Sequence, residues 1–270
     1  MPDSVTLSRF DGKVALITGA AQGIGEATAR LLAERGVAGL LLTDRNGEKG
    51  EAVARSLPVE ALFVAAELED VAAVRRLVPA VEAHFGRLDV LCNIAATTER
   101  GTILDTGEAA YERIMGVNLR APFFLIQDAA LLMRRLGIAG TIVNVSSVNA
   151  HGGAPFLTAY SASKAALVNL TRNVANALAW DRIRVNCVLP GWVDTPGEHE
   201  TLKRFHDAAD NWLEEAEKGR PFRRLVKPNE IARAIAYLAS EESGIMTGAL
   251  LDFDQTVPGT PSEGLGPMAD

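Results

Sequence analysis

The sequence predicts an α/β fold in which one doubly wound parallel sheet of about seven strands carries helices on both faces. Strand-like and helical segments alternate about seven times along the chain, with few hairpin signals. The strand-like segments are continuous apolar runs, which indicates that both faces of the sheet are buried. No linker or shift in composition divides residues 1–270, so we expect a single domain.

The expected elements follow one another in a regular order. Apolar runs predict strands at residues 13–18, 38–43, 61–66, 88–96, 141–147, 183–190 and 249–254. Helical spacing predicts helices at residues 26–35, 46–56, 70–84, 108–135, 158–180 and 228–240. Pro79 is expected to disturb the second half of the third helix.

Two stretches interrupt this order. Residues 196–226 are charged and helical, and we expect them to form an insertion that covers the substrate beside the strand ends. Residues 257–270 are rich in proline and glycine, and this tail is expected to be loose or to pack on a neighbouring subunit.

Composition restricts the class of protein. Hydrophobic residues make up 48% and charged residues 23%, as in soluble globular proteins. The net charge of −7 argues against nucleic acid and anionic membranes as partners. Residues 1–10 lack the apolar core of a signal peptide, and Cys92 and Cys187 lie in apolar runs typical of buried reduced thiols. We therefore expect a cytoplasmic protein.

A glycine-rich turn joins the first strand to the first helix. The stretch TGAAQGIGEA places Gly19, Gly23 and Gly25 in the spacing GxxxGxG. Glycines let the backbone approach a ligand closely, and the free N–H groups of a helix start favour phosphate. The turn therefore predicts a dinucleotide site, the alternative being a glycine-rich turn without a ligand.

Asp44 ends the second predicted strand, about 20 residues after the last glycine. A carboxylate there can accept hydrogen bonds from both hydroxyls of the adenosine ribose and would repel a 2′-phosphate. Gln22 offers no counter-ion for that phosphate, whereas Arg45 could hold it. The sequence therefore favours NAD over NADP. The alternative role for Asp44 is a helix cap or a turn residue.

The stretch TAYSASKAAL places Tyr160 and Lys164 on one face of a helix. A proton carrier works best when its pKa lies near the operating pH, and free tyrosine titrates near ~10. An ammonium about 4 Å away would supply about 4 kcal/mol at an effective dielectric of ~20, enough to lower the pKa of Tyr160 to about 7–8. Alone, the pair would also fit a core tyrosine beside a lysine that reaches solvent.

Ser147 lies at the carboxyl end of the strand predicted at 141–147, where ligands bind in open α/β sheets. Its hydroxyl could bind the substrate oxygen. With this serine, the chain resembles the short-chain dehydrogenase/reductase family of the classical type. The shared pieces cover nearly the whole chain in the family's order: TGAAQGIG, VNL (117–119), SS (146–147), the Tyr160–Lys164 pair and LPGWVDT (189–195).

The resemblance implies a Rossmann fold and an oxidoreductase that interconverts a CH–OH group and a ketone by hydride transfer. It implies a catalytic tetrad of Asn118, Ser147, Tyr160 and Lys164, with Tyr160 as general acid/base and Asn118 holding a water that links Lys164 to solvent. The residues expected to bind the cofactor are Gly19, Gln22, Gly23, Ile24, Gly25, Asp44, Glu67, Leu68, Asn93, Ala95, Tyr160, Lys164, Pro190, Gly191, Val193 and Thr195. Thr195 would hydrogen-bond the nicotinamide carboxamide.

Three segments depart from the family's usual pattern. NIAA (93–96) stands in place of NNAG, which changes the local loop. Glu67 replaces an aspartate before Leu68, so its contact with adenine is an open question. LDFDQTVPG replaces DGG, and Asp252, Phe253 and Asp254 are expected to shape a different subunit contact. The resemblance implies a homo-oligomer, either a tetramer or a dimer, that forms through the long helices at 108–135 and 158–180.

The residues expected to contact the substrate are Ser147, Asn149, His151, Tyr160 and Trp192, together with the segment 198–205. Their amide, imidazole, indole and carboxylate groups suit a hydroxyl-rich ligand. The segment GWVDTPGEHETLKRFH is also loosely similar to sugar and polyol dehydrogenases. We therefore predict NAD-dependent oxidation of a sugar or polyol secondary alcohol. The alternatives are a hydroxyacyl or other small carbonyl substrate, or a non-catalytic NAD-binding regulator.

Three histidines each have an alternative to a functional role. His151 could equally occupy a surface loop. His199 and His206 do not have convincing metal-ligand spacing, and no metal site is expected.

Overall fold

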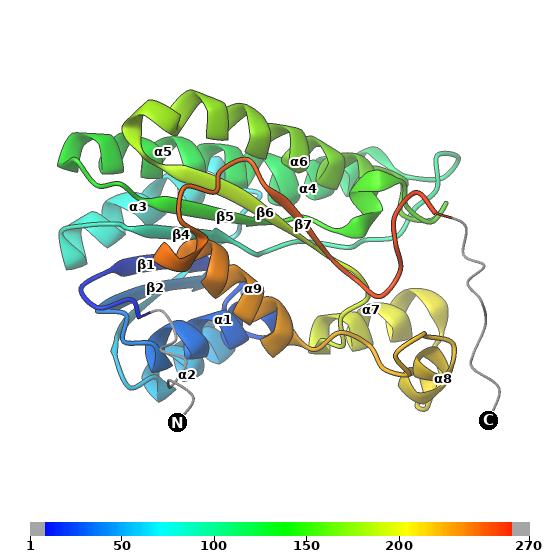
Figure 1. The fold of residues 1–270 in the computed structure, drawn as a ribbon. Helices are drawn as coiled ribbons and strands as arrows, with labels where there is room; N and C mark the ends of the chain where they lie inside the picture. The colour runs from blue at the N-terminus through cyan, green and yellow to red at the C-terminus, as the bar shows by residue number, and fades with distance from the viewer. Residues whose placement is uncertain (1–8, 261–270) are drawn as a thin grey trace, which may run out of the picture.

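The computed structural model describes residues 9–260 and has the predicted layers of a sheet between helices (Figure 1). The seven strands are all parallel and lie in the order β3-β2-β1-β4-β5-β6-β7. They are β1 (Val14–Thr18), β2 (Gly39–Asp44), β3 (Glu60–Ala65), β4 (Val90–Asn93), β5 (Thr141–Val145), β6 (Arg184–Pro190) and β7 (Leu250–Phe253). The predicted doubly wound sheet is therefore confirmed.

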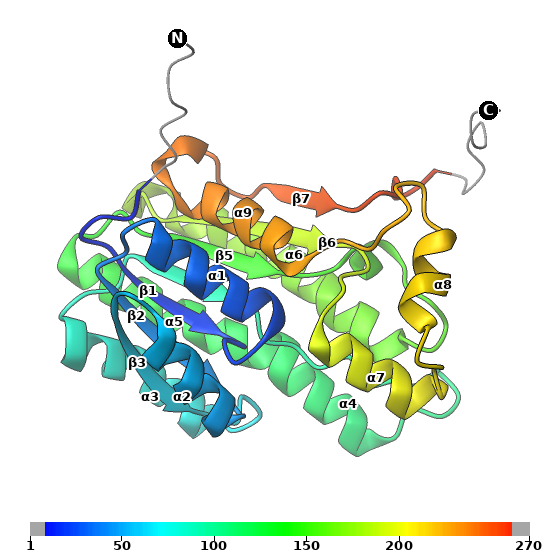
Figure 2. The same cartoon turned by 90° about the horizontal axis from the view of Figure 1, so that it is seen from below.

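Helices cover both faces of the sheet (Figures 1 and 2). One face carries α1 (Gly23–Glu34), α2 (Gly47–Ser56) and α9 (Pro228–Ala239). The other carries α3 (Val71–Phe85), α5 (Ala121–Leu136) and α6 (Thr158–Leu178), with α4 (Glu108–Met115) against α6. Along β1, Ala15 and Ile17 pack toward the first face and Leu16 toward the second, because strand side chains alternate. Burial on both sides explains the continuous apolar runs of the sequence.

The helix predicted over residues 108–135 is interrupted. α4 ends at Met115, a π-helical turn occupies Gly116–Arg120, and α5 begins at Ala121. The wider turn directs Asn118 inward, where its side chain hydrogen-bonds the backbone of Thr97. A π-turn changes the apolar periodicity too little to be read from the sequence.

The disturbance expected from Pro79 does not end the helix, since α3 continues from Val71 to Phe85. Proline removes one helix hydrogen bond. However, the apolar stripe around it, with Leu77, Val78 and Val81, is buried against the sheet. Packing of an apolar face provides most of the stability of a helix in a protein.

β4 is shorter than the strand predicted at 88–96 and ends at Asn93. Beyond it, the N–H groups of Ile94 and Ala95 donate to the Thr18 hydroxyl, at 2.9 and 3.0 Å. Because these two N–H groups bond a side chain and not a neighbouring strand, the strand ends here and a loop begins at the carboxyl edge of the sheet.

The stretch 196–226 forms two helices, α7 (Pro196–His206) and α8 (Trp212–Lys218), beyond the carboxyl ends of the strands (Figures 1 and 2). Leu202, Trp212 and Leu225 give the insertion a small apolar core of its own. Most of the tail, 261–270, lies outside the described residues. Among residues 9–260, no helix combines the length and apolarity needed to cross a membrane.

Candidate active site

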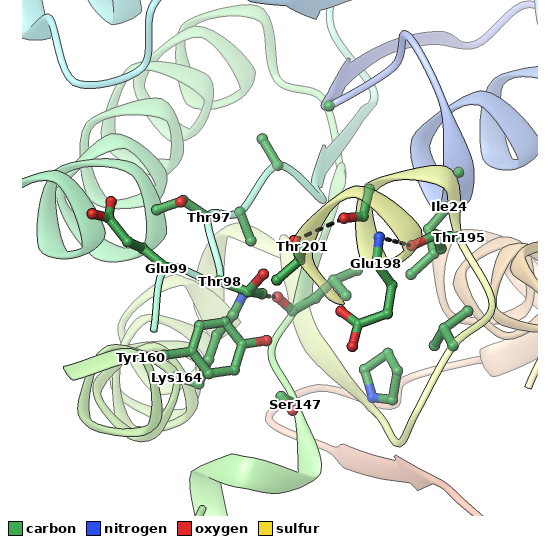
Figure 3. Close-up of a pocket in the computed structure, with 18 of the residues that line it drawn as sticks. Ile24, Thr97, Thr98, Glu99, Ser147, Tyr160, Lys164, Thr195, Glu198 and Thr201 are labelled. Carbon is green, nitrogen blue, oxygen red and sulfur yellow. Dashed lines mark hydrogen bonds between the residues drawn. The ribbon is translucent and has the colours of Figure 1, made fainter. Parts of the chain in front are cut away.

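The carboxyl ends of the strands open onto a cavity of about 1340 Å³ (Figure 3). Most of the residues predicted from the sequence line it: Gly19, Gln22, Gly23, Ile24, Gly25, Asp44, Glu67, Leu68, Ala95, Ser147, Asn149, Tyr160, Lys164, Pro190, Gly191, Trp192, Val193 and Thr195. Segments far apart in the chain thus meet at the edge where open α/β sheets bind ligands.

The glycine loop is built for close backbone approach. A Cβ on Gly25 would lie 2.0 Å from the Gly19 carbonyl oxygen, and a Cβ on Gly19, at φ +70°, would lie 2.9 Å from the Cα of Ala95. Gln22 precedes α1 without a side-chain cap, so N–H groups of the first turn face the cavity edge. This cradle fits the phosphates of a dinucleotide.

Asp44 lies beside this cradle. One carboxylate oxygen accepts from the Ala21 N–H at 3.2 Å, and the other accepts from the Asn46 N–H at 2.9 Å. The cap of α2 is Asn46, which accepts from the Lys49 N–H, so Asp44 is not the helix cap. Its bond to the Asn46 N–H, two residues on, makes it a turn residue, the other part of that alternative. The Lys49 ammonium donates to the Gln22 amide at 3.2 Å, which adds a cation at this end of the cavity.

Tyr160 and Lys164 lie one turn apart on α6, and both are buried. The Lys164 ammonium donates to the Val145 carbonyl at 2.8 Å and lies 5.7 Å from the centre of the Tyr160 ring. The Ser147 hydroxyl accepts from the backbone and side-chain N–H groups of Asn149, at 3.1 and 3.2 Å. Its own proton can be donated to an oxygen in the cavity, and the Tyr160 oxygen is one such acceptor.

Burial dominates the titration of this pair. It raises the pKa of Tyr160 to about 12, although the Ser147 hydroxyl acts in the opposite direction. Burial also lowers the pKa of Lys164 to about 8. The sequence predicts that an ammonium about 4 Å away lowers the pKa of Tyr160 to about 7–8, whereas in this structure burial raises it. The physical reason is that both groups lose water, while the ammonium is directed to the Val145 carbonyl.

Asn118 joins two parts of the site from the π-helical turn. Its carbonyl accepts from the Thr97 N–H at 2.9 Å, and its amide donates to the Thr97 carbonyl at 3.0 Å and to the Ser163 hydroxyl at 3.1 Å. Asn118 is buried and does not itself line the cavity. It therefore fixes the loop after β4 onto α6, next to Lys164.

Besides Asn118, two predicted residues do not line the cavity. Asn93 is buried in the sheet, where its amide donates to the Asn144 side chain at 2.8 Å, and its contact with the cofactor stays a prediction. His151 is paired with Asp252 at 2.8 Å on the surface and does not line the cavity. It ends a 3-10 turn over Val148–His151, and its contact with the substrate stays a prediction.

The cavity also contains a residue that the sequence did not single out. Arg100, in the loop after β4, lies 3.4 Å from the Glu198 carboxylate on α7. The Trp192 indole N–H donates to the same carboxylate oxygen at 2.9 Å. Burial raises the pKa of Glu198 above its usual range. The only sequence signal for Arg100 was its place in a loop that follows a strand of the parallel sheet.

A second ion-pair network ties the insertion to the sheet. Lys227 donates to Asp194 at 2.9 Å and to Glu217 on α8 at 3.2 Å. The other oxygen of Asp194 lies 2.7 Å from the ring of His199 on α7, and the Trp212 indole donates to that ring. α7 and α8 are thus held at one point beside the cavity.

Comparisons with known proteins agree with this fold and site. The family model described as enoyl-(acyl carrier protein) reductase matches residues 19–255. The chain is 39% identical over 252 residues to the cis-4-hydroxycyclohexanecarboxylate dehydrogenase of Sinomonas cyclohexanicum, covering 91% of this chain and 96% of that relative. It is 33% identical over 252 residues to the galactitol 2-dehydrogenase of Agrobacterium fabrum, covering 91% and 97%. The crystal structure of NAD+-bound xylitol dehydrogenase has a TM-score of 0.82 at 30% identity, covering 92% and 99%.

The chain therefore belongs to the short-chain dehydrogenase/reductase family. The protein is an enzyme, an oxidoreductase of a family that binds a nicotinamide cofactor and small-molecule substrates. The names of its relatives differ in substrate, so family membership alone does not select one.

Proposed function

We propose that the protein is an NAD-dependent oxidoreductase that interconverts a secondary alcohol and a ketone, with a sugar or polyol as substrate. One observation carries this proposal. The Tyr160 and Ser147 side chains and Lys164 line the same cavity as the glycine cradle and Asp44. A single cavity therefore offers a dinucleotide site and a proton-transfer group together.

The proposed chemistry divides between cofactor and protein. Bound NAD supplies the acceptor for the hydride that leaves the alcohol carbon. Tyr160 takes the proton of the substrate hydroxyl in this direction and returns it in the reverse direction. The Ser147 hydroxyl donates a hydrogen bond to the same substrate oxygen and so holds it beside the phenol.

Lys164 supports the phenolate by its charge. With a pKa of about 8, its ammonium is largely protonated at neutral pH despite its burial. A positive charge near the phenol favours the ionised form of Tyr160, as does the charge of an oxidised nicotinamide ring. We further propose, from the family's pattern, that Asn118 holds a water that passes protons between Lys164 and solvent.

The preference for NAD rests on Asp44. Its carboxylate lines the adenosine end of the cavity and would repel a 2′-phosphate. Arg45 lines the same end, and Lys49 lies beside Gln22. Because a cation can bind a 2′-phosphate, NADP is tested separately from NAD.

The preference for a polyol rests on the polar lining of the substrate end. Asn149, Trp192, Glu198 and Arg100 face the cavity from separate segments. Two of the compared proteins are named for polyols, galactitol and xylitol. The description of the matching family model favours the second candidate, a hydroxyacyl or related carbonyl substrate.

We also propose a homo-oligomer, tetramer or dimer, in the cytoplasm. α5 exposes apolar side chains, among them Phe123 at 46% and Leu131 at 58%. Cys92 and Cys187 are buried free thiols, which suits a reducing compartment. Native mass spectrometry should give a mass of two or four chains, and a monomer at micromolar concentration would contradict the oligomer.

The decisive experiment measures nicotinamide reduction by the purified protein. NAD and NADP are supplied separately with sugars, polyols, acyl alcohols and sterols. We expect turnover of a sugar or polyol with NAD, and we expect Tyr160→Phe to lower kcat by about 10²–10⁴-fold, the usual contribution of general acid/base catalysis.

Tyr111→Phe is the matched control, because Tyr111 is half-exposed on α4 and outside the cavity lining. It should keep the wild-type rate. Full activity of Tyr160→Phe would contradict the proposed mechanism. If the protein oxidises acyl alcohols and no sugar or polyol, the proposed substrate becomes the second candidate, a hydroxyacyl or related carbonyl compound.

A further inference from the structure

Glu198 brings a carboxylate into the cavity next to the proposed acid/base. It lies in the first turn of α7, and its side chain is only 16% exposed. Figure 3 shows its carboxylate and the Tyr160 hydroxyl directed into the same space, with Ser147 at the edge. Burial is the main cause that raises the pKa of Tyr160, and the negative charge of Glu198 raises it further.

The two oxygens of this carboxylate differ in their partners. Oε1 accepts from the Trp192 indole at 2.9 Å and from the Arg100 guanidinium at 3.4 Å. Within residues 9–260, no group donates a hydrogen bond to Oε2. Since each carboxylate oxygen can accept about two hydrogen bonds, Oε2 keeps its capacity for a ligand in the cavity.

The chemistry of that free oxygen selects the ligand. An apolar chain would bury Oε2 without a donor, which is unfavourable. A carboxylated ligand would meet its like charge, and a hydroxyl group would donate to it. Arg100 offsets this preference only in part, because three of its five N–H groups already donate to Glu198, the Thr98 carbonyl and the ring of His206, and its charge is paired with Glu198.

We propose that Glu198 determines specificity by accepting a hydrogen bond from a second hydroxyl of the substrate, close to the hydroxyl that is oxidised. The substrate class is then a neutral compound with neighbouring hydroxyl groups. This inference deepens the proposed function and rests on it. Arg100 and Trp192 orient the Glu198 carboxylate, which leaves Oε2 for the substrate.

The test compares two substrates that differ in one hydroxyl, cyclohexane-1,2-diol and cyclohexanol. We expect Glu198→Gln to lower kcat/KM for the diol by about 10- to 100-fold, as expected for a hydrogen bond to a charged group. For cyclohexanol the change should stay within about threefold, since that substrate has no second hydroxyl. Equal losses for both substrates would overturn the proposal, because a general defect of the site lowers both.

Glu214→Gln is the matched control, since Glu214 lies on α8 and pairs with Lys218 at the surface. Glu214→Gln should leave kcat/KM unchanged for both the diol and cyclohexanol. 4-Hydroxycyclohexanecarboxylate is the third substrate. If the wild-type enzyme prefers it to the diol, a carboxylate site at Arg100 replaces our proposal.

A binding measurement separates this inference from the proposed function. Titration calorimetry with the Tyr160→Phe protein, NAD and the diol reports affinity without turnover. Adding Glu198→Gln should raise the Kd of the diol by about tenfold or more and leave that of cyclohexanol unchanged. An unchanged Kd for the diol overturns the role of Glu198. Failure of the proposed function appears instead as wild-type protein that reduces no cofactor.

Discussion

The two ends of the cavity are built in different ways. At the proposed cofactor end, the glycine cradle is backbone from one continuous segment, in which Gly19 and Gly25 come so close that no Cβ fits between them. The substrate end is held by side-chain pairs between distant segments, such as Arg100 with Glu198 and Lys227 with Asp194. A backbone contact tolerates no added atom, whereas side-chain pairs can be weakened one at a time. Substitutions at the two ends should therefore differ in severity.

The largest effect is expected at the cofactor end. Gly25→Ala places a Cβ 2.0 Å from the Gly19 carbonyl oxygen, so the loop must move. Overpacking costs about 1–3 kcal/mol, and we expect the Kd for NADH to rise by about 10- to 100-fold. Fluorescence titration measures this value at a temperature where circular dichroism shows the variant to be folded.

Gly47→Ala provides the control for this prediction. A Cβ on Gly47, at the start of α2, meets no atom within 4 Å. Its Kd for NADH should equal that of the wild type. If Gly25→Ala binds NADH with the wild-type Kd, the glycine cradle can adjust to an added Cβ. The expected difference in severity between substitutions at the two ends of the cavity would then be contradicted.

A smaller effect is expected at Lys164, where the two ends meet. Its pKa is about 8 in the folded protein and about 10.5 in the unfolded chain. Between these values the unfolded chain binds more protons, so the free energy of unfolding rises with pH, by roughly 1 kcal/mol per unit between pH 8 and 10. Above pH 10, Tyr160 acts in the opposite direction, because its pKa is raised to about 12.

Urea unfolding of wild type and Lys164→Met at pH 7, 8, 9 and 10 measures this contribution. The difference in unfolding free energy between the two proteins should change steadily across the window, in favour of the wild type as the pH rises. A difference that is the same at every pH would mean that Lys164 titrates alike in both states.

The smallest effect is expected in the insertion. Lys227→Met removes two partly exposed ion pairs, with Asp194 and with Glu217, and pairs of this kind contribute about 0.2–1 kcal/mol each. We expect KM for the best alcohol to rise about two- to fivefold while the Kd for NADH stays constant. Lys203→Met, which removes an exposed pair with Asp210, should change neither. A parallel rise in the Kd for NADH would show that the ends are coupled.

The fold and the cofactor end were largely predictable because their signals are local. Strands and helices follow from apolar runs and periodicity, and Gly25 and Asp44 follow from one strand-turn-helix segment and the end of the next strand. The same local pattern placed Tyr160 and Lys164 on α6. These positions need no knowledge of which distant segments come together.

The features of the site that the sequence did not predict depend on contacts between segments far apart in the chain. The position of Arg100 in the cavity depends on the contact between the loop after β4 and α7, which the sequence does not show. His151 lies outside the cavity lining and pairs with Asp252, about a hundred residues later in the chain. The pKa of Tyr160 was misjudged for a related reason. The spacing of four residues predicted that Lys164 lies beside Tyr160. It did not predict that both groups are buried, or that the Lys164 ammonium donates to the Val145 carbonyl.

The two hydrogen bonds from Asn118 to the backbone of Thr97 divide the loop after β4 into an anchored part and a variable part. Up to Thr97 the loop is fastened to the helix that carries Tyr160. Beyond Thr97, Glu99 pairs with Arg113 on α4 and Arg100 pairs with Glu198 on α7. Substitutions in this second part would change the α7 side of the cavity and leave the anchored part, next to Tyr160 and Lys164, in place.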